Sequence, residues 1–219
     1  MPIKAIVFDM DGILVDTEKY WQQARVELAA SVGQEWTLDD QRFLMGSNTR
    51  EWVEYTKKRL KLEHMSDEQV EAAIKNRLLN YYETSLPVMP GAMEAVQLTA
   101  THYPIALASG SSHWAIDAVM RLTGLGKTIK VKVSADEVAR GKPQPDVFLE
   151  AARRLGVAPH EMIGIEDSGN GIRALKAAGM KVIAVPTPEI PLSDETIGMA
   201  DVLLPSLKAY NLALLETLN

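Results

Sequence analysis

The stretch Phe8-Asp9-Met10-Asp11-Gly12-Ile13-Leu14-Val15-Asp16-Thr17-Glu18 decides the fold, and it continues directly from the apolar run Ala5–Phe8. A short, continuously apolar run of this kind is typical of a strand buried on both faces. Carboxylates are seldom buried unless they are paired or bind a metal. Asp9 and Asp11, placed where such a strand should end, therefore indicate a functional site.

Other apolar runs along the chain have the same character, and they alternate with segments of helical periodicity. The expected strands span residues 5–8, 105–109, 131–134, 162–165, 182–185 and 202–204. The expected helices between them span residues 114–122, 146–155 and 169–178. This alternation predicts an α/β fold with a Rossmann-like, mostly parallel sheet that carries helices on both faces.

One region interrupts the alternation, because no convincing strand occurs between Glu18 and Tyr82. Trp21, Ala24 and Leu28 recur at helical spacing, and Ser66-Asp67-Glu68-Gln69 has the pattern of a capping box ahead of an amphipathic helix. We therefore expect a small helical cap domain over residues 16–85. It would be inserted into an α/β core domain formed by residues 1–15 and 86–219.

Composition excludes several classes of function. The 219 residues include no cysteine, which excludes disulfides and thiolate metal sites, and the formal net charge is −6. No basic cluster predicts a nucleic acid partner, and no apolar run approaches the roughly 20 residues of a membrane span. The expectation is a cytoplasmic protein, monomeric, that neither binds nucleic acid nor enters a membrane.

Polar residues follow three of the expected strands. Asp9 and Asp11 follow the first, the run Ser109-Gly110-Ser111-Ser112 ends the second, and Glu166 and Asp167 follow the strand at 162–165. Ligands of parallel sheets bind beyond the carboxyl ends of the strands, so these groups should converge there.

The four acids would repel one another without a cation. Asp9, Asp11, Glu166 and Asp167 offer only oxygen ligands, a donor set that favours Mg²⁺. Taken singly, each acid is equally compatible with a helix cap or a turn.

Two further segments have features of a phosphate site. Small residues in the run Ser109-Gly110-Ser111 allow backbone N–H groups to approach an anion at a helix N-terminus. Lys142 lies in Gly141-Lys142-Pro143-Gln144-Pro145-Asp146, where two prolines restrict the backbone. A serine-capped turn and a surface lysine are the alternative readings of these two segments.

The run Gly169-Asn170-Gly171-Ile172-Arg173-Ala174 matches the outline of a dinucleotide fingerprint. Glu166 and Asp167 precede it, however, and would face the position of a pyrophosphate. We therefore expect these glycines to serve the close approach of a helix to the sheet.

Taken together, four segments resemble the haloacid dehalogenase superfamily of phosphotransferases, in order and in spacing. They are FDMDGILVDTE from Phe8, ALASGSS from Ala106, GKPQPD from Gly141 and IGIEDSGNGIRALKAAG from Ile163. The resemblance covers essentially the whole chain. The helical insertion is similar to the small cap of the group that contains β-phosphoglucomutase and the sugar-phosphate phosphatases.

The resemblance implies a role for each matching residue. Asp9 would be the nucleophile that forms an aspartyl-phosphate, and Asp11 the general acid and base. Ser109 and Lys142 would hold the phosphoryl group. Asp167, with Glu166 beside it, would complete the Mg²⁺ site.

Within the family, Trp21 separates two activities. β-Phosphoglucomutases have a histidine at this position, four residues after the threonine that is Thr17 here. The run Glu18-Lys19-Tyr20-Trp21 and the tail Val185-Pro186-Thr187-Pro188-Glu189 look closer to hexitol-phosphate and 2-deoxyglucose-6-phosphate phosphatases. We therefore expect a Mg²⁺-dependent phosphatase that acts on a small phosphate ester of a sugar or polyol.

Two alternatives stay open, a β-phosphoglucomutase-type isomerase and a non-catalytic phosphosugar-binding protein. Trp21, Arg50 and Arg77 of the cap are candidates for substrate contact, as is His113 behind the serine run. The alternative readings are a core position for Trp21 and a solvated charge for each arginine.

Overall fold

The computed structural model describes residues 2–44, 46–187 and 191–218. Its centre is a six-stranded sheet in the order β3-β2-β1-β4-β5-β6, in which every neighbouring pair is parallel. The strands are β1 Ala5–Phe8, β2 Ile105–Ser109, β3 Val131–Ser134, β4 Met162–Glu166, β5 Lys181–Ala184 and β6 Val202–Leu203. The predicted α/β class and parallel sheet are confirmed.

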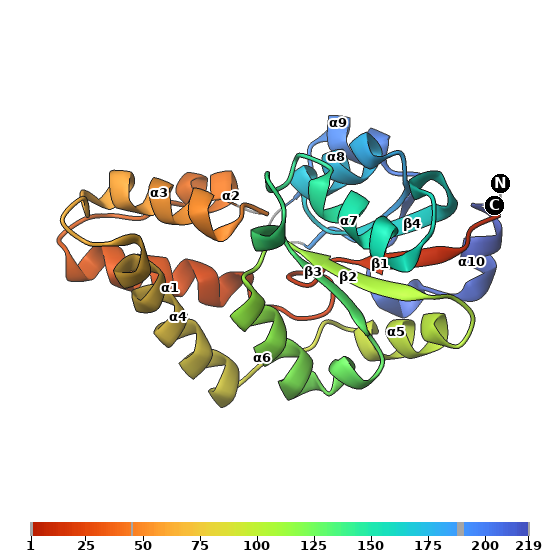
Figure 1. Ribbon diagram of the computed structural model, residues 1–219, viewed down its shortest axis with the longest axis horizontal. Helices are drawn as coiled ribbons and strands as arrows, with labels where there is room; N and C mark the ends of the chain where they lie inside the picture. Colours follow the sequence, from red (N-terminus) through yellow and green to blue (C-terminus); the bar gives the residue numbers. More distant parts are fainter. Residues whose placement is uncertain (1, 45, 188–190, 219) are drawn as a thin grey trace.

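Helices cover both faces of this sheet (Figure 1). They are α5 Ala92–Ala100, α6 His113–Thr123, α7 Asp146–Leu155, α8 Gly169–Ala178, α9 Asp194–Met199 and α10 Leu212–Glu216. Side chains of β1 alternate between the two cores, because successive residues of a strand point to opposite faces. Ile6 and Phe8 pack with α5 and α6, whereas Ala5 and Val7 pack with α7 and α8.

The predicted bounds agree with the structure for β1, β2, β3, α7 and α8. Strand β4 runs one residue further than expected, because Glu166 still pairs in register with Ala184 of β5. The backbone N–H of Val185 also donates to the Glu166 carbonyl at 2.8 Å. Pro188 and Glu189, the end of the tail singled out above, lie outside the described residues.

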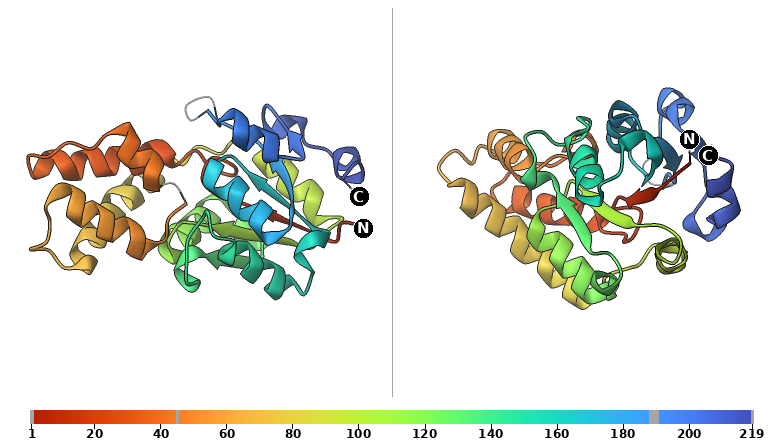
Figure 2. Two further views of the ribbon diagram at one scale, coloured as in Figure 1. Left: turned by 90° about the horizontal axis from the view of Figure 1, so that it is seen from above. Right: turned by 45° about the vertical axis from the view of Figure 1, so that its right-hand side comes forward.

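Four helices follow β1, and Figures 1 and 2 show them beside the end of the sheet that lies away from both termini. They are α1 Glu18–Ser31, α2 Leu38–Leu44, α3 Thr49–Leu60 and α4 Asp67–Thr84. The capping box predicted from Ser66 and Gln69 is present at the start of α4, and Asn48 and Glu51 form another at α3. The described residues of this region form no strand with one another, as expected.

The chain passes between the sheet and these four helices at two places that lie side by side. The Asp16 N–H donates to the Pro87 carbonyl at 2.9 Å, and the Met89 N–H donates to the Leu14 carbonyl at 3.0 Å. We propose the boundaries of the cap domain here, close to residues 16 and 85. None of the described helices has the length and apolar character needed to cross a bilayer.

Candidate active site

A buried cluster of charges lies at the carboxyl ends of β1 and β4. Asp9 follows β1, and its N–H still donates to the Ile165 carbonyl of β4 at 3.0 Å. The ammonium of Lys142 bridges the two strands, at 2.7 Å from Asp9 Oδ1 and 2.5 Å from Glu166 Oε1. All three side chains are buried, so these ion pairs are shielded from solvent.

Burial and mutual repulsion shift the pKa values of these groups. Burial raises the pKa of Asp9 to about 8, with further contributions from Glu166 and Asp11 against the opposing effect of Lys142. Burial, with the charge of Glu166, likewise raises the pKa of Asp167 well above its usual value. Burial alone would lower the pKa of Lys142, but Asp9 and Glu166 raise it above its ordinary value. The single ammonium of Lys142 thus does not balance the negative charge of these carboxylates, and a divalent cation would supply the positive charge that is needed.

Asp9, Glu166 and Asp167 lie close enough together to hold a metal ion. Each places one carboxylate oxygen within 4.8 Å of the others. Glu166 is already engaged, because Lys142 donates to its Oε1 while the N–H and hydroxyl of Ser168 donate to its Oε2 at 2.8 and 3.0 Å. The donor set suits a hard cation such as Mg²⁺.

The Asp11 carboxylate is not part of this three-residue group, and its expected place among the metal ligands stays a prediction. Hydroxyl groups hold it instead. Thr17 donates to Oδ1, and Ser111 donates to Oδ2 at 2.8 Å, with Ser109 at 3.3 Å from the same oxygen. Asp11 therefore lies at the pocket wall, where these hydroxyls fix the orientation of its carboxyl group.

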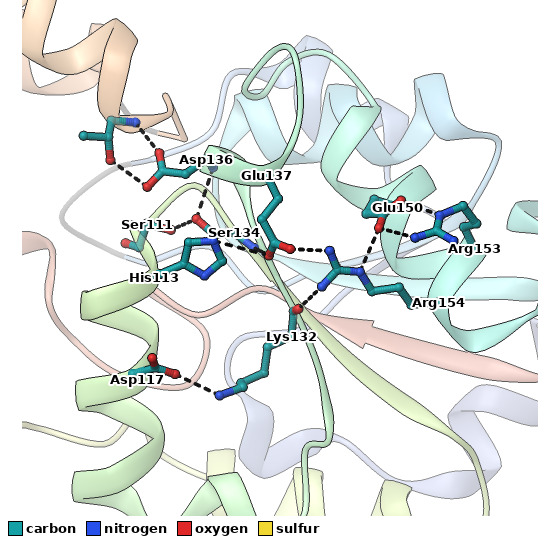
Figure 3. A network of polar contacts seen from close by, with 11 residues as sticks. Ser111, His113, Asp117, Lys132, Ser134, Asp136, Glu137, Glu150, Arg153 and Arg154 are labelled. Atoms are coloured by element: carbon teal, nitrogen blue, oxygen red, sulfur yellow. Dashed lines mark hydrogen bonds and ion pairs between the residues drawn. The ribbon is translucent and has the colours of Figure 1, made fainter.

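The serine run after β2 forms a rigid loop. The Ser111 N–H donates to the Ser109 hydroxyl at 3.0 Å, and the Ser134 hydroxyl donates to the Ser111 carbonyl at 2.7 Å (Figure 3). Gly110 and Ser111 line the pocket beside Asp9. Ser109 is buried, and its hydroxyl lies 3.3 Å from Asp11 Oδ2, so its contact with a phosphoryl group stays a prediction.

Two glycines allow the acids to sit this close together. Gly12 has a φ of +80°, and a Cβ there would lie 2.1 Å from Asp167 Oδ2. A Cβ on Gly171 would lie 1.7 Å from Glu166 Oε1. The glycine pattern of α8 thus permits a close approach of helix and strand, as predicted, and leaves Glu166 in the space where a side chain would otherwise be.

A pocket opens above these groups, between the sheet and the cap. Its wall on the sheet side includes Asp9, Asp11 and Lys142. Its wall on the cap side includes Trp21 and Trp52, whose rings meet edge to face at 6.0 Å. Trp21 is buried as well, so it is both a core residue and part of the pocket wall.

The other three candidates for substrate contact lie away from this pocket. Arg50, at the start of α3, is exposed and contacts the Ala139 carbonyl at 3.4 Å across the junction of cap and core. Arg77 bonds within its own helix to the Ala73 carbonyl at 2.6 Å. His113 lies beside Glu137 with 60% of its side chain exposed (Figure 3). Each of these placements depends on how the cap or a loop packs, which local sequence does not encode.

Sequence reasoning missed two charged residues of the cap wall, Glu18 and Arg25. Glu18 is half-buried, and Arg25 is 4% exposed. Arg25 follows Trp21 by four residues, which places both on one face of α1. That spacing was a usable signal, since Trp21 was itself a candidate.

Comparisons with known proteins agree with this geometry. The sequence profile of the haloacid dehalogenase-like hydrolases matches residues 3–179. Hexitol phosphatase B of Escherichia coli K12 is 34% identical over 210 residues, covering 94% of this chain and 93% of that protein. A phosphorylated carbohydrates phosphatase of Thermotoga maritima is 31% identical over 182 residues, covering 83% of this chain and 84% of that protein.

Solved structures with a similar fold include members of the same group. CbbY from Rhodobacter sphaeroides in complex with phosphate has a TM-score of 0.78 at 25% identity and covers 94% of this chain and 96% of its own. A β-phosphoglucomutase from Clostridium difficile shares the fold, with a TM-score of 0.82 at 24% identity and coverage of 99% and 96%. The chain thus belongs to the haloacid dehalogenase-like hydrolases, in the group that contains hexitol phosphatase B and CbbY.

Proposed function

We propose that this hydrolase is a Mg²⁺-dependent phosphatase of small sugar or polyol phosphates that acts through an aspartyl-phosphate. The observation that carries the proposal is the position of the Asp9 carboxylate. It faces the pocket 2.7 Å from the Lys142 ammonium, in a group with Glu166 and Asp167 and beside the fixed carboxyl of Asp11. The carbohydrate phosphatases among its relatives support the substrate class.

In the first step Asp9 attacks phosphorus and Asp11, in its acid form, gives its proton to the departing alcohol oxygen. In the second step Asp11 accepts a proton from water, which attacks phosphorus and releases phosphate with Asp9 restored. Division into two displacements is the usual advantage of a carboxylate nucleophile. Lys142 holds Asp9 in place and neutralises charge on the phosphoryl oxygens.

Asp9 and Asp167 would hold Mg²⁺, which when bound supplies positive charge to the phosphoryl oxygens. Glu166 keeps a different role in this proposal. Its two oxygens bind Lys142 and Ser168, so it orients the lysine at the carboxyl end of β4. Gly110 lines the pocket just ahead of α6, and its N–H would be a further donor for an anion.

Trp21 favours hydrolysis over return of the phosphoryl group to a sugar. An indole has a single N–H donor and takes no part in proton exchange near neutral pH. The hydroxyls of Thr17 and Ser111 hold Asp11 instead, without a histidine.

Substrate entry requires the cap to move. A Cβ on Gly110 would lie 2.8 Å from the backbone of Gly46, so the loop ahead of α3 rests on the serine loop. Thr49 likewise binds Asp136 of the core at 2.8 and 2.9 Å. The side-by-side crossings near Asp16 and Pro87 are suited to act as a hinge.

We expect a panel of phosphorylated sugars and polyols to yield free phosphate with wild-type protein and Mg²⁺. Phosphate is measured colorimetrically, and glucose 6-phosphate formed from β-glucose 1-phosphate is measured in parallel with a coupled dehydrogenase. Faster formation of glucose 6-phosphate than of phosphate would favour the isomerase. Binding of the panel without turnover would favour a non-catalytic role.

A further inference from the structure

Arg25 is a buried cation in the wall of the active-site pocket. Its guanidinium carbon lies 4.9 Å from the ring centre of Trp21, 5.8 Å from that of Trp36 and 5.9 Å from that of Trp52. The three indoles surround the group and favour its positive charge. Burial lowers the pKa of Arg25 to about 10, partly offset by Glu18, which leaves the side chain protonated at neutral pH.

The described residues leave this cation poorly satisfied. A guanidinium has five N–H donors, and the structure shows one bond, from Nη1 to the amide oxygen of Gln41 at 2.9 Å. Nε is buried and has no hydrogen-bond partner among the described residues. No carboxylate of those residues forms an ion pair with Arg25, although ion pairs are common elsewhere in the molecule.

Glu18 is the acid that interacts most strongly with Arg25, but it bonds to Gln41 and forms no ion pair with the guanidinium. Gln41 lies between Arg25 and Glu18, because its amide nitrogen donates to Glu18 Oε1 at 2.5 Å while its amide oxygen accepts from Arg25. The indole N–H of Trp36 binds the same oxygen at 3.3 Å. Gln41 thus fixes the orientation of the guanidinium and contributes no negative charge to it.

A buried cation without an anionic partner is costly unless a ligand supplies the anion. Arg25 and the catalytic group of Asp9 and Lys142 line one small pocket. We propose that Arg25 binds a second oxyanion of the substrate, so that the preferred esters are phosphorylated sugar acids or sugar bisphosphates over neutral polyol monophosphates. The inference rests on the proposed phosphatase activity and narrows its substrate class. The planar guanidinium suits a carboxylate or a phosphate group.

Matched pairs of esters test the proposal. Glucitol 6-phosphate and 6-phosphogluconate differ at the terminal carbon, which is an alcohol in one and a carboxylate in the other. Fructose 6-phosphate and fructose 1,6-bisphosphate differ by the second phosphate. We expect wild-type kcat/KM to be higher, in at least one pair, for the ester that carries the additional carboxylate or phosphate. The pair that shows this difference identifies the oxyanion.

The decisive quantity is a ratio within each pair, the kcat/KM of the ester with the additional oxyanion divided by the kcat/KM of the other ester. We compare this ratio between wild type and Arg25→Met. Methionine keeps much of the apolar volume and removes the charge. We expect the ratio to fall about 10- to 100-fold, as for loss of a hydrogen bond to a charged group. Arg25→Lys should restore part of it. Lys58→Met, which removes an exposed cation of α3, should leave the ratio unchanged.

The outcomes separate this inference from the proposed function. An unchanged ratio in folded Arg25→Met would overturn the role of Arg25 and leave the phosphatase intact, whereas no phosphate release from any ester would overturn the phosphatase itself. Thermal unfolding reports whether each variant folds. If Arg25→Met does not fold, Arg25→Lys provides the test. Lysine keeps the charge but lacks the planar guanidinium, so the ratio should fall below that of the wild type. An unchanged ratio in Arg25→Lys would contradict the proposal.

Discussion

Replacement of Asp9 by asparagine should reduce phosphate release by at least about a thousandfold, because an amide oxygen is too weak a nucleophile to displace the alcohol. The fold should persist. Asparagine has the shape of aspartate, and its oxygen can still accept from the Lys142 ammonium, which lies 2.7 Å from Asp9 Oδ1.

The measurement is steady-state phosphate release with a thermal unfolding curve for each protein. Asp117→Asn is the matched control, since Asp117 is exposed on α6 and pairs with Lys132 on the surface. It should retain wild-type activity. A rate of about a tenth of wild type in Asp9→Asn would exclude Asp9 as the nucleophile, because loss of a nucleophile costs far more than tenfold.

Removal of divalent cations should abolish hydrolysis, and addition of Mg²⁺ should restore it. Asp9 and Asp167 are buried together with raised pKa values, so without a cation they resist the charged state that the chemistry requires. Ca²⁺ should inhibit, because its longer and more numerous bonds disturb the in-line arrangement that Mg²⁺ supports.

Thermal unfolding provides a readout that does not depend on turnover. Mg²⁺ should raise the unfolding midpoint of the wild type, since it binds the folded chain and not the unfolded one. The rise should be lost in Asp167→Asn. Full activity after exhaustive treatment with EDTA would contradict the metal requirement.

The fold could be predicted because its signals are local. Strand β1 and helices α7 and α8 have the bounds that apolar runs, prolines and glycines indicated. The convergence of Asp9 and Asp167 also followed, because the carboxyl ends of parallel strands meet at one edge. The place of Lys142 beside them was implied by the family resemblance alone. The contact of Glu166 with Lys142 did not follow from the sequence, and it is the hydrogen bond from the Lys142 ammonium to Glu166 Oε1 that shows it.

The cap side of the pocket was less accessible to sequence reasoning. Arg50 and Arg77 were candidates because they are cations of the cap. The direction in which each side chain points depends on contacts with segments far apart in the chain, Ala139 for Arg50 and Glu27 for Arg77. Arg25 lies next to Ala24 on an apolar face, where a charge usually marks the edge of the buried stripe. Three indoles, from α1, α3 and the loop before α2, enclose it instead.

The central claim, that phosphate passes through a covalent bond to Asp9, can be tested by trapping that bond. An aryl phosphate with a good leaving group needs no acid for the first displacement, whereas the second still needs a base. The variant Asp11→Asn should therefore accumulate phosphoenzyme during turnover. Acid quenching and peptide mass spectrometry should locate one phosphoryl group per chain on Asp9. Steady hydrolysis by the wild type, with no phosphoryl group on Asp9 in either protein, would contradict the account.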